Sequence, residues 1–158
     1  MTGSAPTKAP VRVADDTLRS FAGYYMKRAF NEVQADLSVR LKPLGLRMVT
    51  FSTLVLIVDN PGLRQSQLAE ALAIERPNIV MILDELQRKG LITRDRAHDD
   101  RRAYAVRATD AGKQTLRQAM AVMRDHEHQV FDVLTQTERQ ALISALHKVE
   151  TGPQGGPT

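Results

Sequence analysis

The stretch from Arg94 to Thr109, RDRAHDDRRAYAVRAT, combines charges of both signs with a run of alternating apolar residues. Its first nine residues hold four arginines, three aspartates and one histidine. An arginine that enters a narrow minor groove of DNA meets an enhanced negative potential, and a nearby carboxylate can hold its guanidinium in a fixed orientation. The stretch therefore indicates a basic tip that touches DNA, with Arg96 and Arg101 as candidate phosphate contacts. A solvated turn of mixed charge is the alternative.

A second set of candidate DNA contacts lies in RPNIVMILDELQR, where apolar residues recur at helical spacing. Arg76 and Asn78 lie on the outward face near its start, and such side chains pair with guanine and adenine edges in the major groove. Arg88, at the far end of this segment, suits an interaction with the helix dipole or with a phosphate. Ser66 and Gln67, in the preceding short helix, could touch phosphates. A solvated helix face is the alternative. The candidate contacts on these two helices are Ser66, Gln67, Arg76, Pro77, Asn78, Met81 and Arg88.

The sequence shows no pattern typical of catalysis or of a metal site. It has no cysteine, which excludes disulfides and thiolate ligands. His126 and His128 are two residues apart in a helical segment and point to different faces, whereas metal-binding histidine pairs on helices need a wider spacing. No Gly-rich phosphate loop and no paired nucleophile and base are present. We therefore predict no enzyme, no cofactor and no metal.

Composition favours an ordinary globular protein with an acidic partner. The chain has 158 residues, of which 42% are hydrophobic, and a formal net charge of +4. Positive charge favours nucleic acid, but residues 61–110 hold nine Lys or Arg and eight Asp or Glu, so a DNA-binding surface must gather its cations on one face. The longest apolar run, Leu54–Val58, is too short to cross a bilayer, and the N-terminus lacks a signal-peptide core. We expect a cytoplasmic protein.

Apolar periodicity and breaker residues predict six helices and one hairpin. The helices are expected at about residues 15–41, 47–59, 65–72, 77–89, 110–133 and 135–149, and the strands at about 91–96 and 102–108. Thr135 and Glu138 match a capping box. Tyr104 and Val106 share one face of the second strand, and we expect both to pack against the helices.

Two helices joined by a tight turn and followed by a hairpin indicate a winged helix-turn-helix. The predicted fold class is mainly α, with a two-stranded β wing and an α-helical dimerisation region formed by the N- and C-terminal helices. We expect one domain over residues 14–150, with its winged lobe at about 47–110. Dimerisation helices are expected at about 15–41 and 110–150, because they carry more apolar surface than so small a lobe can cover. Residues 1–13 and 151–158 are expected to be disordered tails.

Three segments resemble the MarR family of transcriptional regulators. LRQSQLAEAL (63–72) resembles the first helix of that family's helix-turn-helix, and ERPNIVMILDELQRKGLITR (75–94) resembles its recognition helix and the start of its wing. DDRRAYAVRATDAGKQ (99–114) resembles its wing signature, in which Asp100 would orient the wing arginine, Arg102. One departure is Arg64, where the family often has a threonine that caps the helix. Capping would then fall to Ser66 or to water, or the cap would be weaker.

The resemblance implies a homodimer that binds a pseudo-palindromic operator, and a small aromatic, often anionic effector between the first, second and fifth helices. The segment FAGYYMKRAF at 21–30 holds four of the seven aromatic residues, beside two cations. An apolar slot with convergent cations suits an aromatic carboxylate, or the phosphates of an aromatic acyl-CoA. Plain core or dimer interface is the alternative for these aromatics. The candidate ligand residues are Phe21, Tyr24, Tyr25, Arg28, Arg40 and Phe51.

We thus predict a dimeric, sequence-specific DNA-binding regulator, with repression relieved by a small aromatic acid or aromatic acyl-CoA. Two alternatives stay open. One is a winged-helix module that docks a partner protein, and the other is a DNA-binding regulator that responds to no ligand.

Overall fold

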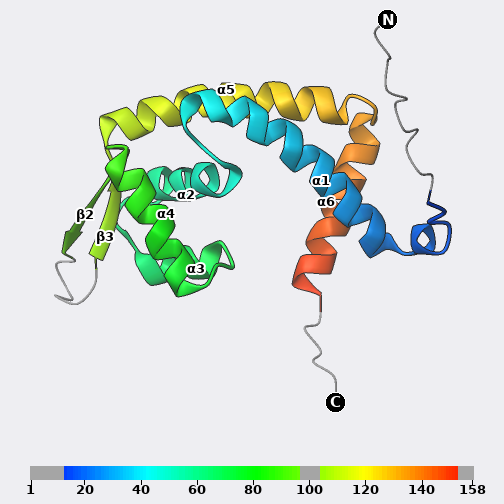
Figure 1. Ribbon diagram of the computed structural model, residues 1–158, viewed down its shortest axis with the longest axis horizontal. Coiled ribbons are helices and arrows are strands. Elements are labelled where there is room, and N and C mark those ends of the chain that lie inside the picture. Colours follow the sequence, from blue (N-terminus) through cyan, green and yellow to red (C-terminus); the bar gives the residue numbers. More distant parts are fainter. Residues whose placement is uncertain (1–12, 97–103, 153–158) are drawn as a thin grey trace, which may run out of the picture. The chain divides into compact units, whose positions relative to one another are not determined.

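The computed structural model describes residues 13–96 and 104–152, apart from the side chain of Arg96 (Figure 1). Contacts divide the chain into two compact units, one ending at Val33 and the other beginning at Gln34. The boundary falls within helix α1, which runs Ala22–Leu41. Most of the segments predicted as tails lie outside the described residues, although helix α6, Gln136–Thr151, continues to Thr151.

The first unit begins with a short 3-10 helix, Leu18–Ser20, ahead of α1. The helix predicted to start at Asp15 starts instead at Ala22, because Phe21 is extended, with φ −106° and ψ 127°, and separates the two helices. The interruption brings Tyr24 back to Asp15, and the tyrosine hydroxyl donates to the carboxylate over 2.6 Å.

The second unit confirms the predicted helix-turn-helix. Helices α2, α3 and α4 run Met48–Asp59, Gln65–Ala71 and Arg76–Arg88, close to the predicted bounds. Apolar residues at helical spacing face inward from all three, because burying them removes apolar surface from water. The fully buried core residues of these helices include Leu54, Ile57, Leu68, Ile79, Leu83 and Leu86.

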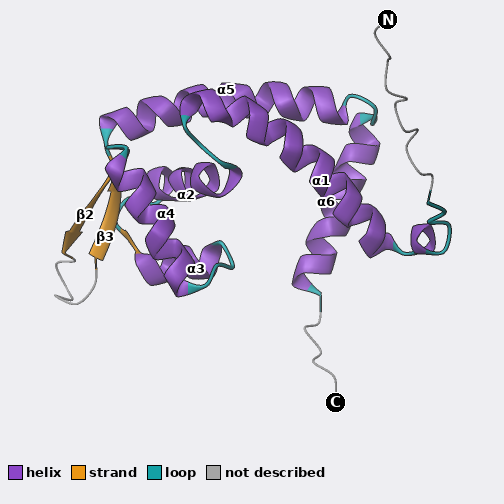
Figure 2. Ribbon diagram, in the orientation of Figure 1, coloured by secondary structure: helices purple, strands orange, loops and turns teal. Residues whose placement is uncertain are grey.

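A three-stranded antiparallel sheet lies beside these helices, in the order β1-β3-β2 (Figure 2). Strands β2, Ile92–Arg96, and β3, Tyr104–Ala108, form the predicted wing hairpin. Strand β1, Leu63–Arg64, adds a third strand that sequence patterning missed, because two residues are too few for alternation to be recognised. The sheet therefore ties the wing to the segment immediately before α3.

The two residues expected to pack on the same face of β3 differ in burial. Val106 is fully buried, as predicted. The prediction for Tyr104 is wrong, because this residue pairs with Arg96 at the outer end of the described strands and is 46% exposed. The core no longer covers the sheet at that end.

Two long helices complete the second unit. Helix α5, Asp110–Phe131, is capped by Thr109, whose hydroxyl accepts from the Gly112 N–H over 3.0 Å. The predicted break between α1 and α2 consists of a 3-10 turn at Lys42–Leu44 followed by Gly45, which has φ 66°.

Helix α6 buries none of its residues within the chain, so its apolar side chains lie exposed. They are Leu142, Ile143, Leu146 and Val149.

Within the described residues, no single helix is both long enough and apolar enough to cross a membrane. The segments 22–44 and 48–59 are long enough and apolar enough only when the two are taken together.

Candidate nucleic-acid interface

The N-terminal end of α4 presents polar side chains to solvent. The helix begins at Arg76 with Pro77 in its first turn, and Glu75 precedes it in an extended conformation. Ile79 and Leu83 are buried, which sets the rotation of the helix and turns Arg76, Asn78 and Met81 outward. Met81 is 69% exposed, so the outward face of the helix carries a large apolar side chain beside its polar ones.

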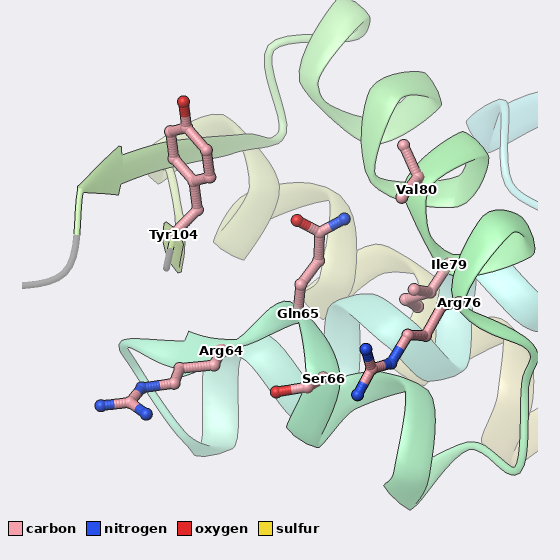
Figure 3. A pocket seen from close by; sticks show the side chains of 7 residues that line it. All are labelled: Arg64, Gln65, Ser66, Arg76, Ile79, Val80 and Tyr104. Atoms are coloured by element: carbon pink, nitrogen blue, oxygen red, sulfur yellow. The ribbon is translucent and has the colours of Figure 1, made fainter. Parts of the chain in front are cut away.

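A notch of about 350 Å³ lies between the start of α3, the start of α4 and β3 (Figure 3). Figure 3 shows the Arg76 side chain directed toward Ser66, and Gln65 projecting between Tyr104 and Val80. Arg64 lies on the opposite side of the notch from Arg76. The residues that line it are Arg64, Gln65, Ser66, Arg76, Ile79, Val80 and Tyr104.

The notch separates the charges that are mixed along the sequence. Its lining includes two arginines and no carboxylate. Glu70 and Glu75 line a second hollow, which shares Ser66 and Arg76 with the notch. Within the described residues, the notch thus brings two arginines together without a carboxylate. Sequence reasoning missed Arg64, Gln65 and Tyr104, because only folding brings β1, α3 and β3 together.

The start of α3 resolves the question of its cap. The backbone N–H of Arg64 donates to the side-chain oxygen of Gln67 over 2.9 Å. Gln67 thus satisfies the backbone N–H of the residue that precedes the helix. This bond was not among the alternatives expected from the sequence, which were a cap from Ser66, a cap from water or a weaker cap. Ser66 remains exposed and lines the notch.

The wing is attached to α4 by Arg94. Its guanidinium forms an ion pair with Asp84 and donates from Nε to the Gln87 side chain over 2.5 Å. These contacts fix the base of the hairpin relative to the recognition helix. The predicted contacts at its tip, namely the Arg96 side chain, Asp100, Arg101 and Arg102, lie outside the described part of the structure.

The C-terminal end of α4 has a structural role. Lys89 Nζ donates to the backbone carbonyl of Gly45 and, over 2.7 Å, to Glu85. Lys89 and Arg47 hold the pKa of Glu85 below its ordinary value, with Lys89 as the larger cause. Arg88 is exposed in the last turn of α4, where a cation suits the helix dipole.

Four of the predicted ligand residues lie in the first unit. The Tyr24 hydroxyl accepts a long hydrogen bond, 3.4 Å, from Arg28, whose guanidinium lies 5.7 Å from the Tyr24 ring centroid. Tyr24 and Tyr25 meet edge to face with their ring centroids 6.4 Å apart. Phe21 and Tyr25 are exposed. This aromatic and cationic surface is largely solvated in the single chain.

The other two predicted ligand residues, Arg40 and Phe51, lie in the second unit. Phe51 is a buried core residue of α2. Arg40 donates from Nε to Asp36 over 2.5 Å and from its terminal nitrogen to Gln129 of α5 over 2.6 Å. The same Asp36 oxygen lies 2.7 Å from Nδ1 of His126, which is 1% exposed. Arg40 and, to a smaller extent, His126 lower the pKa of Asp36.

Sequence reasoning missed the role of His126. The i,i+4 spacing of Asp36 and Arg40 was a usable signal for their ion pair, but nothing local pointed to a histidine ninety residues away. His126 and His128 do face different directions, since His128 is 84% exposed. The described residues contain no group of three or more metal-ligating side chains.

Comparisons with known proteins agree with this geometry. A model of the MarR family matches residues 46–104, which span the helix-turn-helix and the first described residue of β3. A putative transcriptional regulatory protein for the hcr operon of Thauera aromatica is 42% identical over 107 residues, which are 66% of this chain and 63% of that protein. The aligned region thus spans less than two thirds of this relative.

Solved structures of a transcriptional repressor, CouR, are similar over nearly their whole length. CouR bound to a 23-mer DNA duplex is 35% identical with a TM-score of 0.84, and the match covers 89% of this chain and 99% of that one. CouR bound to p-coumaroyl-CoA is 32% identical with a TM-score of 0.82 and the same coverage.

Proposed function

The chain belongs to the MarR family of winged helix-turn-helix transcriptional regulators, and from this premise we propose that it is a homodimeric repressor released from its operator by an aromatic acyl-CoA or a small aromatic acid. Members of this family are regulators and not enzymes. The observation that carries the DNA-binding part is the exposed start of α4 beside a notch lined by arginines and free of carboxylates.

In this proposal the start of α4 enters the major groove. Arg76 and Asn78 read base edges, while Ser66 and the notch contact the phosphate backbone, which positions the helix. By resemblance to the family, the wing arginine Arg102, oriented by Asp100, enters the adjacent minor groove, and Arg96 and Arg101 contact phosphates. Two lobes in a dimer would engage half-sites about 34–36 Å apart, one helical turn.

The exposed apolar side chains of α6 support a dimer. Four of them recur at helical spacing on a helix that buries nothing within its own chain. A surface of this kind on a small protein is typical of an interface. Dimerisation is also the rule in this family.

The effector class rests on the similarity to a repressor that binds p-coumaroyl-CoA. Aromatic side chains and a cation of the kinds that such a ligand needs are present in this chain at Phe21, Tyr24, Tyr25 and Arg28. The ligand can relieve repression only if it binds the DNA-free arrangement of the dimer more tightly than the DNA-bound one. A regulator that responds to no ligand would show no such difference in ligand affinity between the two arrangements.

DNA binding is tested with operator duplexes selected from a random pool of roughly 30 base pairs, long enough for two half-sites. We expect Arg76→Ala to weaken binding by roughly 5- to 150-fold for each half-site, because one bidentate base contact contributes about 1–3 kcal/mol. The matched control is Arg117→Ala, an exposed arginine on α5, which should change affinity less than twofold. Fluorescence anisotropy measures both.

Salt dependence separates the proposal from a protein-docking module. The affinity for DNA should fall steeply between 50 and 200 mM salt, on the order of a thousandfold if about six phosphates are contacted. Selection of no duplex at low salt would contradict DNA binding. Addition of p-coumaroyl-CoA should release the selected duplex, and its failure to do so would remove that effector while leaving the DNA-binding function intact.

A further inference from the structure

A polar network joins the second half of α1 to α5, with only its histidine buried. Its centre is one carboxylate oxygen of Asp36, which accepts from Arg40 Nε over 2.5 Å and lies 2.7 Å from Nδ1 of His126. Arg40 also reaches Gln129, one turn beyond His126 on α5. His126 is buried, whereas Asp36 and Arg40 are partly exposed. The imidazole therefore lies at the inner end of the network.

The contact with Asp36 orients the imidazole. Nδ1 of His126 faces a carboxylate oxygen that can only accept, so this ring nitrogen donates to Asp36. In the tautomer whose single proton is on Nδ1, Nε2 is an acceptor.

Nε2 of His126 has no hydrogen-bond partner among the described residues, although it is buried. A buried polar atom without a partner is destabilising by about 1–3 kcal/mol, and in a folded protein it calls for an explanation. An acceptor whose orientation is held by a carboxylate is complementary to a group that donates, such as a hydroxyl.

We propose that Nε2 of His126 accepts a hydrogen bond from the hydroxyl group of an aromatic effector, so that His126 selects hydroxylated aromatic acyl groups over unsubstituted ones. This inference rests on the proposed effector class. The phenolic hydroxyl of a 4-hydroxycinnamoyl group donates well, whereas an unsubstituted ring offers nothing to Nε2. A site that hydrogen-bonds a hydroxyl rejects the analogue without it, because the analogue leaves the buried acceptor unpaired.

The test compares two thioesters that differ by one hydroxyl, p-coumaroyl-CoA and cinnamoyl-CoA. We expect the wild-type protein to bind the hydroxylated compound at least about tenfold more tightly. Isothermal titration calorimetry on the full chain gives both affinities without any substitution. Equal affinities for the two compounds would overturn the inference and leave the effector class standing. Binding of neither compound would instead overturn the proposed effector class, and this inference with it.

Substitutions then assign the preference to His126. His126→Phe removes both ring nitrogens, and the ratio of the two affinities should fall to about one. His126→Gln, whose side-chain oxygen can accept, should restore part of the preference. His128→Phe, two residues along and exposed, is the matched control and should keep the wild-type ratio. A purely structural histidine would shift both affinities by the same factor, so an unchanged ratio in folded His126→Phe would contradict the proposal.

Discussion

At the scale of single residues, Gly112 allows α5 to approach the start of the wing. Its N–H donates to the Thr109 hydroxyl, and that hydroxyl donates to the carbonyl of Gly90 over 2.6 Å. A Cβ atom built on Gly112 would lie 2.0 Å from the carbonyl oxygen of Leu91, far inside van der Waals contact. The absence of a side chain at this position is therefore a packing requirement rather than a conformational one.

We expect Gly112→Ala to lower the free energy of unfolding by about 2–4 kcal/mol, at the upper end of overpacking costs, because backbone atoms must move to accommodate the methyl group. Urea unfolding at fixed protein concentration measures the loss. The matched control is Gly23→Ala in α1, where a Cβ meets no atom within 4 Å and the alanine should be neutral or slightly stabilising. Equal stability of the two variants would show that the approach of α5 to Leu91 is not tight.

At the scale of elements, α6 begins with the capping box that its sequence predicts. The Glu138 N–H donates to the Thr135 hydroxyl over 3.3 Å, and the Thr135 N–H donates back to the Glu138 carboxylate over 2.8 Å. The Thr135 hydroxyl and N–H lower the pKa of Glu138. The cap is the main local signal that starts this helix, because α6 has no buried side chain to hold it in place within the chain.

We expect Thr135→Ala to cost about 1 kcal/mol of stability at pH 7. Thr137→Ala, exposed inside the same helix, should be neutral. The pKa of Glu138 is lowered in the folded state, so its contribution is present above its ordinary value of 4.5 and is lost as pH falls through the lowered value. Urea unfolding should therefore show a smaller difference between Thr135→Ala and the wild-type protein at pH 3 than at pH 7. An equal difference at both pH values would exclude the carboxylate from the cap.

At the scale of the whole molecule, α6 offers an apolar surface that its own chain leaves open. The proposed dimer would cover this surface and set the spacing of the two recognition helices. The effector would then act by favouring one spacing over another. The spacing of the recognition helices and its response to the effector would both require two chains.

We expect Ile143→Glu combined with Leu146→Glu to dissociate the dimer, because two buried, unpaired charges at an interface are costly. Sedimentation equilibrium should then report a monomer, and operator affinity should fall by more than tenfold, since each lobe binds one half-site alone. Gln136→Glu combined with Gln140→Glu adds the same charge to exposed positions of α6 and should remain dimeric. A dimer that survives the apolar substitutions would place the interface elsewhere.

The predicted elements depend on short-range signals, which explains where prediction was accurate. Helical spacing identified the buried side of α4, and Thr135 and Glu138 form the capping box that was expected of them. The errors arose where a longer-range contact competes. Asp15 binds Tyr24 instead of starting a helix, and Tyr104 lies beyond the core despite sharing the parity of Val106.

By itself, the sequence determined the order of the six helices and the wing hairpin, the outward placement of Arg76 and Asn78, and the family. Periodicity, caps and motif spacing act over a few residues and can be recognised along the chain. Only the tertiary structure decided that Arg64, Gln65 and Tyr104 share a notch with Arg76, that Gln67 serves the start of α3, and that Asp36 orients His126. Most of these arrangements depend on contacts between residues far apart in the chain, and such contacts form only when the core brings the helices and the sheet together.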